Sequence, residues 1–178
     1  MNNKIYTIGI DPGASGGIVA LTNGTVTAID AMPSTPKGIY EHFLYLGFPN
    51  MINKEKTYVY MELVHAMPTD GVRSAFSFGR HMGHLDTISD LLCLNPTLVT
   101  PVGWMSYFDI QKKEKGESRY NFKKRLLQFA LLQFARSRCR DKGKREQLNL
   151  KTCDAYLIAL YGYYQQSQQS NKRKKPSG

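Results

Sequence analysis

The order of short apolar segments and turns at the start of the chain constrains the fold most strongly. Lys4 to Ile10 (KIYTIGI) is apolar and rich in β-branched residues, as is typical of a buried strand. The turn residues Asp11-Pro12-Gly13 follow it. Asn23-Gly24 then separates two further strand-like segments, 16–21 and 25–30, and Asn-Gly in this setting is a strong hairpin signal. The sequence therefore predicts an antiparallel meander of three strands.

Strands and helices alternate after this meander. We expect strands at 57–61 and 97–100, and helices at 72–92, 118–135 and 150–164. A meander followed by such alternation predicts an α/β fold in which helices flank a mixed five-stranded sheet. The segments 32–38 and 65–71, which are rich in proline, glycine and polar residues, are predicted to be loops.

The predicted helix at 72–92 contains two glycines four residues apart, Gly79 and Gly83. Glycine lowers helix propensity, so its presence here suggests close packing, either on the sheet or on a partner. The expected apolar face consists of Ala75, Phe78, Met82, Leu85, Ile88 and Leu92.

The length of 178 residues favours one domain, which we place at 1–164, followed by a basic tail without fixed structure at 165–178. No apolar run approaches the roughly 18 residues of a membrane helix, and no secretory signal is visible, so we expect no membrane partner. The three cysteines, Cys93, Cys139 and Cys153, form no CxxC pair. Reduced thiols and a cytoplasmic location are the expectation.

The charge is unevenly distributed. The formal net charge is +10, yet the segment 111–146 alone carries 13 Lys/Arg against four Asp/Glu. The tail adds four cations, which leaves the rest of the chain slightly acidic. Segregated positive charge favours a polyanionic partner such as nucleic acid, although a solvated lysine-rich helix face has the same pattern.

Three carboxylates lie at informative positions. Asp11 ends the first strand, Glu62 ends the strand after the meander, and Asp154 lies near the start of the last helix. If the two strands are parallel neighbours, their carboxyl ends bring Asp11 and Glu62 to one edge of the sheet. Each residue alone could be a turn former or a helix cap. Together they would suit Mg²⁺ or Mn²⁺, and two such ions can promote phosphodiester hydrolysis.

Four motifs in order resemble the RuvC-type Holliday-junction resolvases of the ribonuclease-H-like superfamily. Ile8-Gly-Ile-Asp-Pro-Gly13 with Ser15-Gly-Gly17 resembles the family's first strand and hairpin, and Tyr60-Met-Glu62 resembles its second acidic position. Ser74-Ala75 with Gly79 and Gly83 is similar to its S-A-x-x-x-G-x-x-x-G helix. Cys153-Asp-Ala-Tyr-Leu-Ile-Ala159 is similar to its closing helix. The resemblance covers about residues 4 to 164.

The resemblance implies a metal-dependent endonuclease that acts as a two-fold dimer on four-way DNA junctions. Asp11, Glu62 and Asp154 match the family's metal-binding carboxylates, which would hold two Mg²⁺ ions, or Mn²⁺, in each site. Each subunit would nick one strand and leave a 5′-phosphate. A small enzyme of this kind would suit a bacterial or phage-infected cytoplasm, by analogy alone.

Two positions depart from the family pattern. Lys151 stands where the family usually has a fourth acid or a histidine, and a protonated lysine cannot ligate a metal. It could contact a phosphate instead, or mark a junction-binding protein with weakened catalysis. His65 stands where some members have a phenylalanine that stacks on bases, and His65, Met67 or Phe76 could serve there.

The remaining candidates were weighed against simpler roles. The run Gly13 to Gly17 lacks the Gly-Lys-Ser/Thr of a phosphate-binding loop, and the chain is too short for a two-lobed sugar kinase, so no nucleotide cofactor is expected. His81 and His84 favour packing over zinc, and Trp104 favours the core. Contacts to the DNA backbone are predicted for Arg73, Arg80, Lys112, Lys113, Lys115, Arg119, Lys123 and Lys124.

Overall fold

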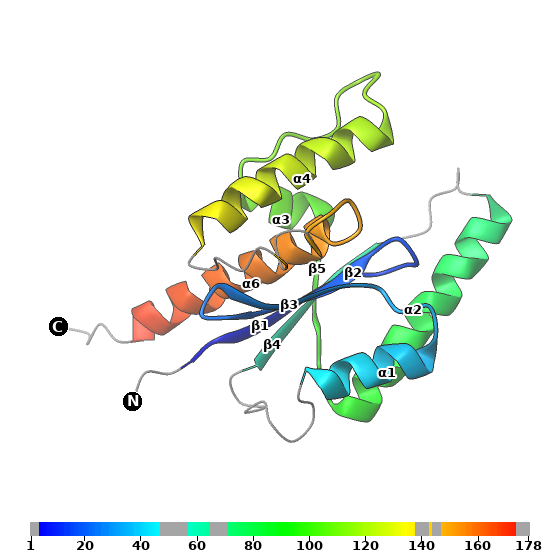
Figure 1. Cartoon of the computed structure of the whole chain (residues 1–178), viewed down its shortest axis with the longest axis horizontal. Helices are drawn as coiled ribbons and strands as arrows, with labels where there is room; N and C mark the ends of the chain where they lie inside the picture. Colours follow the sequence, from blue (N-terminus) through cyan, green and yellow to red (C-terminus); the bar gives the residue numbers. More distant parts are fainter. Residues whose placement is uncertain (1–3, 47–56, 65–70, 138–142, 144–146, 174–178) are drawn as a thin grey trace.

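One five-stranded mixed sheet forms the centre of the molecule (Figure 1). The computed structural model describes residues 4–46, 57–64, 71–137, 143 and 147–173. The strands lie in the order β3-β2-β1-β4-β5. Their bounds are β1 Tyr6–Asp11, β2 Gly17–Thr22, β3 Thr25–Ala31, β4 Thr57–Glu62 and β5 Thr97–Val99. The predicted α/β fold with a mixed five-stranded sheet is confirmed.

The register of β1 explains how the sheet positions its acidic residues. β1 pairs antiparallel with β2 and parallel with β4, with Ile10 opposite Met61. The carboxyl ends of β1 and β4 therefore lie at the same edge, where Asp11 and Glu62 are the last residues of their strands. The condition on which the sequence argument depended, that these two strands are parallel neighbours, therefore holds.

Helices cover both faces of the sheet (Figure 1). A pair of helices packs on one face and a second group on the other. No helix within the described ranges is both long and apolar enough to cross a membrane. The first pair is α1 Pro36–Tyr45 and α2 Val72–Leu92, and the second group is α3 Pro101–Tyr107, α4 Arg119–Arg136 and α6 Cys153–Arg173.

Alternation along the strands divides the buried side chains into two layers. Ile8 and Ile10 of β1 belong to the layer under α1 and α2, which includes Leu85 and Ile88 of α2. The intervening positions, Gly9 and Asp11, face the other layer, which is built around α3, α4 and α6. The catalytic candidates therefore belong to the face that the carboxyl-terminal half of the chain covers.

Two helices were not predicted. α1 begins at Pro36, inside the segment 32–38 that we expected to be a loop, and α3 begins at Pro101. The same local signal starts both: a threonine side chain accepts a hydrogen bond from a backbone N–H two residues into the helix, and proline takes the first helical position. The prediction placed Pro36 in a loop and used Pro101 only to end the strand at 97–100. Proline is well tolerated at the first position of a helix, where the backbone N–H that it lacks would have no partner within the helix.

The last helix differs from its prediction at both ends. α6 begins at Cys153 rather than at 150, so Asp154 lies in its first turn. It continues to Arg173, beyond the expected end at Tyr164. The prediction of a tail without fixed structure is therefore wrong for 165–173, whose glutamines and serines extend the helix. Residues 174–178 lie outside the described residues.

Candidate active site

The three predicted carboxylates line one cavity of about 700 Å³. Asp11, Glu62 and Asp154 expose only 8%, 7% and 6% of their surface. Buried carboxylates are rare unless they are paired or bind a cation, because water no longer solvates their charge. The structure therefore brings together three acidic side chains that are distant in the sequence, and at a location where charge needs compensation.

A close approach between β1 and α6 places Asp154 beside Asp11. A Cβ atom at Gly9 would lie 2.1 Å from the carbonyl oxygen of Ala155 and 2.3 Å from the backbone N of Ala159. Only glycine allows this contact between strand and helix. Because Gly9 and Asp11 are two residues apart on one strand, both face α6, and Asp154 lies in the turn of α6 nearest to Asp11.

A tryptophan that the sequence favoured only as a core residue orients Glu62. Trp104 of α3 is 1% exposed, which agrees with a core position. Its indole Nε1 also donates a hydrogen bond of 2.9 Å to Oε1 of Glu62. Trp104 is thus a positioning candidate that the sequence analysis missed, because no spacing rule links α3 to β4.

Lys123 lies among the acidic side chains and not at an exposed position, where we expected it as a contact to the DNA backbone. It precedes Leu126, Ala130 and Phe134 on the buried stripe of α4, which directs its side chain inward. Its ammonium contacts Oδ2 of Asp154 and lies 3.5 Å from Oδ2 of Asp11. The side chain of Lys123 is 25% exposed. The sequence does contain a signal for this position, because Lys123 lies at helical spacing from the apolar residues that α4 buries.

Burial and charge shift the ionisation of the site. Burial, together with the charges of Asp154 and Glu62, raises the pKa of Asp11 to about 8, despite the opposing effect of Lys123. Burial also raises the pKa of Glu62. Burial alone would lower the pKa of Lys123, but the carboxylates of Asp154 and Asp11 outweigh it and raise that pKa.

Cys153 lies against the same cluster. Its thiol donates to Oδ1 of Asp154 across 3.2 Å, and its side chain is fully buried. Burial and the nearby charge of Asp154 raise the pKa of this thiol, so Cys153 remains a neutral donor rather than a thiolate ligand.

The donor set suits a hard divalent cation. Carboxylate oxygens are the ligands that Mg²⁺ and Mn²⁺ prefer, and the shared cavity provides three such groups. In the conformation described, however, no three acidic, histidine or cysteine side chains of the placed residues are arranged to hold one ion. The ammonium of Lys123 lies between Asp11 and Asp154 instead.

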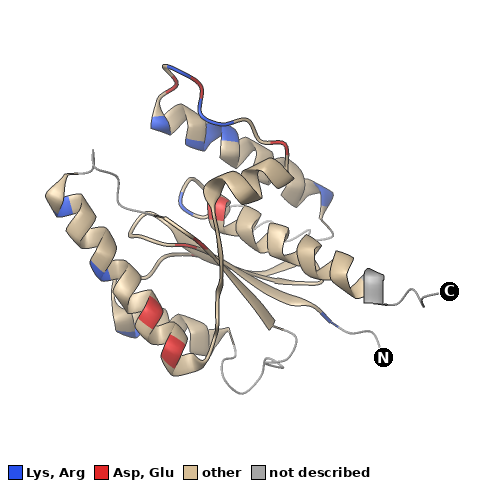
Figure 2. Cartoon of the chain, turned by 180° about the vertical axis from the view of Figure 1, so that it is seen from behind, with Lys and Arg blue, Asp and Glu red and all other residues tan. Residues whose placement is uncertain are grey.

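The other predicted site residues fall into two groups. Arg73, Arg119 and Lys151 line the carboxylate cavity together with Asp11. Lys112, Lys113, Lys115 and Lys124 are exposed, on α4 and the segment before it, and Arg80 is exposed on α2. Figure 2 shows Lys and Arg along these elements. None of these five is among the residues that line the carboxylate cavity. Lys124 lies over the ring of Tyr120, 4.7 Å from its centroid.

The remaining predictions concern residues considered for base stacking or for metal binding. His65 and Met67 lie outside the described residues. The rings of His81 and His84 lie 6.0 Å apart, and within the described ranges no third ligand joins them into a metal site. Phe76 is 71% exposed on α2.

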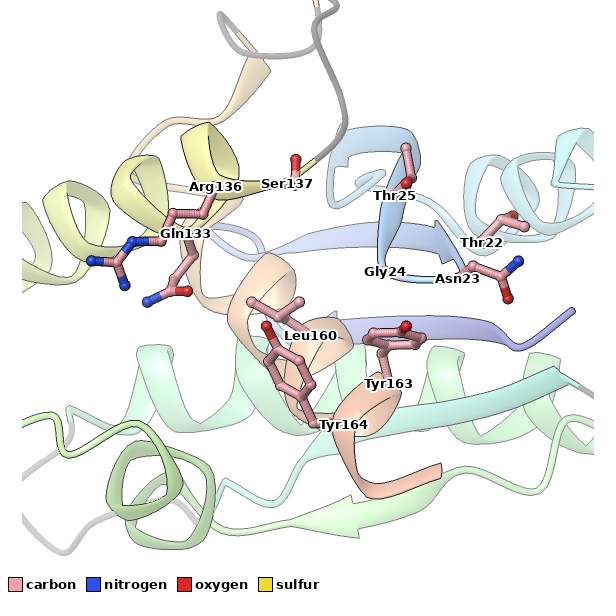
Figure 3. Close-up of a pocket in the computed structure, with 10 residues that line it drawn as sticks. All are labelled: Thr22, Asn23, Gly24, Thr25, Gln133, Arg136, Ser137, Leu160, Tyr163 and Tyr164. Carbon is pink, nitrogen blue, oxygen red and sulfur yellow. The ribbon is translucent and has the colours of Figure 1, made fainter. Parts of the chain in front are cut away.

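A second cavity, of about 730 Å³, lies beside the middle of α6 (Figure 3). The turn between β2 and β3, the end of α4 and the aromatic rings of Tyr163 and Tyr164 line it. Among the described residues that line it are Arg136 and no carboxylate. It therefore lacks the ligands of a Mg²⁺ site and is not the candidate active site.

Comparison with solved structures identifies the fold. Thermus thermophilus RuvC superposes with a TM-score of 0.54 at 13% identity, over 92% of this chain and 97% of that one. The same protein in complex with a Holliday junction substrate superposes with a TM-score of 0.55 at 13% identity, over 92% of this chain and 96% of that one.

The fold is RuvC-like. Searches with family models and against curated proteins gave no match. The structural similarity extends over almost the whole of both chains.

Proposed function

We propose that this chain is a metal-dependent, structure-selective endonuclease that resolves Holliday junctions and other branched DNA by paired nicks. The observation that carries the proposal is the burial of Asp11, Glu62 and Asp154 around one cavity that arginines and lysines also line. The solved complex of RuvC with a Holliday junction supports DNA as the substrate class. Such cleavage would serve DNA recombination and repair in a bacterial or phage-infected cytoplasm.

The chemistry follows from the residues around the cavity. Asp11, Glu62 and Asp154 would hold Mg²⁺ or Mn²⁺, two ions in each site, which activate water and stabilise charge on the scissile phosphate. Trp104 fixes the carboxylate of Glu62 through its 2.9 Å hydrogen bond. Hydrolysis in this site would leave a 5′-phosphate and a 3′-hydroxyl.

Cations at the cavity would position the DNA backbone. Arg73 from α2, Arg119 from α4 and Lys151 from the segment before α6 are all exposed and line the cavity from different elements. Contacts to phosphate fix orientation without reading bases, which suits recognition of DNA shape. Figure 2 shows further cations along α4 and the loop before it, where DNA arms could continue.

Paired nicks require two active sites, and α2 offers a surface for a second copy. Val72 and Phe76 are 89% and 71% exposed on the outer face of α2. Gly79 and Gly83 lie on the same face, and no described atom comes within 4 Å of a Cβ placed on either. The sequence suggested that these glycines allow close packing either on the sheet or on a partner. The prediction of packing on the sheet is wrong. Packing against a partner remains our proposal.

The charges of α2 are self-complementary. Arg73 and Arg80 lie in its amino-terminal half, and Asp86 and Asp90 in its carboxyl-terminal half (Figure 2). An antiparallel pair of α2 helices around a two-fold axis would place the cationic half of each against the acidic half of the other. A junction has approximate two-fold symmetry, so an isologous dimer would present two equivalent sites to it.

A second candidate function is junction binding without cleavage. Lys151 favours it, because a fourth acidic ligand is missing at this exposed position of the cavity. The basic segments would still bind branched DNA under this alternative.

Incubation of a labelled four-way junction with the protein and Mg²⁺ tests the proposal. We expect symmetric nicks on a denaturing gel, and Asp11→Asn should abolish nicking while binding persists. Binding without nicks over a titration of Mg²⁺ and Mn²⁺ would instead favour the binding protein. Mapping the cut sites on mobile and fixed junctions would then reveal any base preference.

A further inference from the structure

The ammonium of Lys123 lies where the candidate metal site has its most negative surroundings. It contacts Oδ2 of Asp154 and is 3.5 Å from Oδ2 of Asp11. Lys123 lies one turn before Leu126 on the buried face of α4. Its position on the helix therefore directs its side chain toward the carboxylates. The ion pairs join three side chains that expose 25% or less of their surface.

The ammonium and a divalent ion would compete for those two oxygens. Mg²⁺ and Mn²⁺ need direct carboxylate oxygens, and Asp11 and Asp154 each offer Lys123 an oxygen of this kind. Two cations close to the same oxygens would also repel each other in a poorly solvated cavity. A metal bound to both oxygens would therefore weaken the ion pairs of Lys123.

The side chain of Lys123 has room for a second position within the cavity. Its side chain is long, partly exposed and itself part of the cavity wall, next to Arg119 on the same helix. A lysine released from the carboxylates would stay in this cavity, on the side where the DNA phosphates are proposed to bind.

We propose that Lys123 is a built-in counter-cation that competes with the divalent metal for Asp11 and Asp154, and that metal loading transfers its ammonium from these carboxylates to the DNA phosphate. The inference rests on the proposed function, because it assumes that this site binds metal. It differs from the backbone contact expected of Lys123 from the sequence, because the first partner of the ammonium is the acid cluster.

The competition predicts that removal of the positive charge of Lys123 strengthens metal binding. Lys123→Met keeps most of the side-chain length and removes the ammonium. The metal-free variant should unfold at a lower temperature than the wild type, because its carboxylates lose their counter-ion. Its affinity for Mn²⁺ should rise about tenfold or more, because the metal no longer displaces a bound cation.

The experiment is isothermal titration of the full-length protein with Mn²⁺ without DNA, combined with thermal unfolding in EDTA and in Mn²⁺. Lys124→Met is the matched control, since Lys124 is the neighbouring residue and lies over Tyr120 away from the acids. We expect tighter Mn²⁺ binding and a larger Mn²⁺-induced rise of the melting temperature for Lys123→Met alone. Equal or weaker Mn²⁺ binding by Lys123→Met would overturn the inference.

Failure of the inference and failure of the proposed function give different results. If the wild type nicks junctions and binds Mn²⁺ but Lys123→Met binds it no more tightly, only the competition is wrong. If neither protein binds Mn²⁺ and no nicks form, both proposals are wrong.

A second measurement decides the matter if Lys123→Met does not fold. An ammonium held in an ion pair exchanges its protons slowly enough for ¹H–¹⁵N spectra of ¹⁵N-labelled lysine, and Lys123→Arg assigns the signal. We expect Mg²⁺ to remove this signal from the spectrum of the wild type. A signal that persists unchanged at saturating Mg²⁺ would overturn the inference.

Discussion

The indole of Trp104 donates a 2.9 Å hydrogen bond to the carboxylate of Glu62, which joins a helix after β5 to the last residue of β4. Both residues are buried. A buried carboxylate with a fixed donor has fewer orientations available, so the hydrogen bond restricts the orientation of Glu62, the position at which we propose that it holds a metal. The helix α3 therefore supports the site, although it carries none of the three carboxylates.

Removal of this hydrogen bond should weaken the site. Trp104→Phe keeps an aromatic ring but loses the Nε1 donor, and we expect junction nicking to fall about 10- to 100-fold. The matched control is Tyr107→Phe on the same helix, which removes the exposed hydroxyl that accepts from Gln168. Nicking rates at saturating Mg²⁺ test this. Equal rates for both variants would contradict a positioning role for Trp104.

The contact between Gly9 and α6 should tolerate no side chain. Gly9→Ala would place a Cβ 2.1 Å from the Ala155 carbonyl oxygen, so strand and helix must move apart. We expect a loss of about 3 kcal/mol or more in the free energy of unfolding, measured in urea. Gly71→Ala is the control, because no described atom comes within 4 Å of a Cβ placed there, so we expect a change of less than about 1 kcal/mol. A fully stable Gly9→Ala would show that the site does not depend on this close packing.

The proposed dimer predicts that a substitution on α2 can prevent dimerisation while the fold stays intact. Gly83→Leu places a large side chain where its own chain leaves open space, so the fold should survive. The same side chain would hold two α2 helices apart. We expect light scattering to show a dimer for the wild type and a monomer for Gly83→Leu. A variant that stays dimeric would place the interface elsewhere.

The raised pKa of Asp11 makes metal binding depend on pH. Below about pH 8 the carboxyl keeps a proton that the metal must displace. Mn²⁺ affinity should therefore increase as pH rises from about 6 to 8, with release of about one proton, and level off above this range. Titration calorimetry in two buffers of different ionisation enthalpy measures the protons released. A flat affinity over this range would contradict the shift.

The same shift has a definite sign for the stability of the metal-free protein. The folded pKa of about 8 lies above the ordinary value of 3.8, so the folded state binds the proton more tightly than the unfolded state does. The contribution of Asp11 is fully present below about pH 4 and decreases as pH rises toward 8. Asp11→Asn should remove this part of the pH dependence of urea unfolding.

Phosphate contacts at the cavity should appear in the salt dependence of binding. Arg119→Gln removes one cation that lines the carboxylate cavity. We expect weaker junction binding and a slope of log K against log salt that is smaller by about one unit. Fluorescence anisotropy between low and moderate salt, with Ca²⁺ in place of Mg²⁺, measures the slope. An unchanged slope would exclude a phosphate contact by Arg119.

The sequence predicted what depends on local periodicity. The strand ending at Glu62 and the helix at 72–92 were expected at nearly the observed bounds, because alternation and a helical apolar face are local signals. The pairing of β1 with β4 entered the sequence argument only as a condition, because strand order depends on contacts between distant segments, and the structure satisfies it. This pairing places Asp11 and Glu62 at one edge of the sheet.

The parts that were missed depend on tertiary contacts or on an ambiguous residue. Pro36 and Pro101 can end a segment or begin a helix, and the capping threonines before them decide for the helix. The partners of Trp104 and Lys123 lie 42 and 31 residues away in sequence, respectively. No pattern within one element indicates such pairs, so a lysine on a buried stripe was expected on the DNA surface.

Anomalous X-ray diffraction from crystals soaked in Mn²⁺ tests the central claim most directly, because it locates the ion independently of activity. We predict manganese peaks bounded by Asp11, Glu62 and Asp154, with the side chain of Lys123 moved away from them. A crystal saturated with Mn²⁺ that has no peak among these three carboxylates, or whose ions bind only elsewhere, would contradict the assignment of this cavity as a metal-dependent nuclease site.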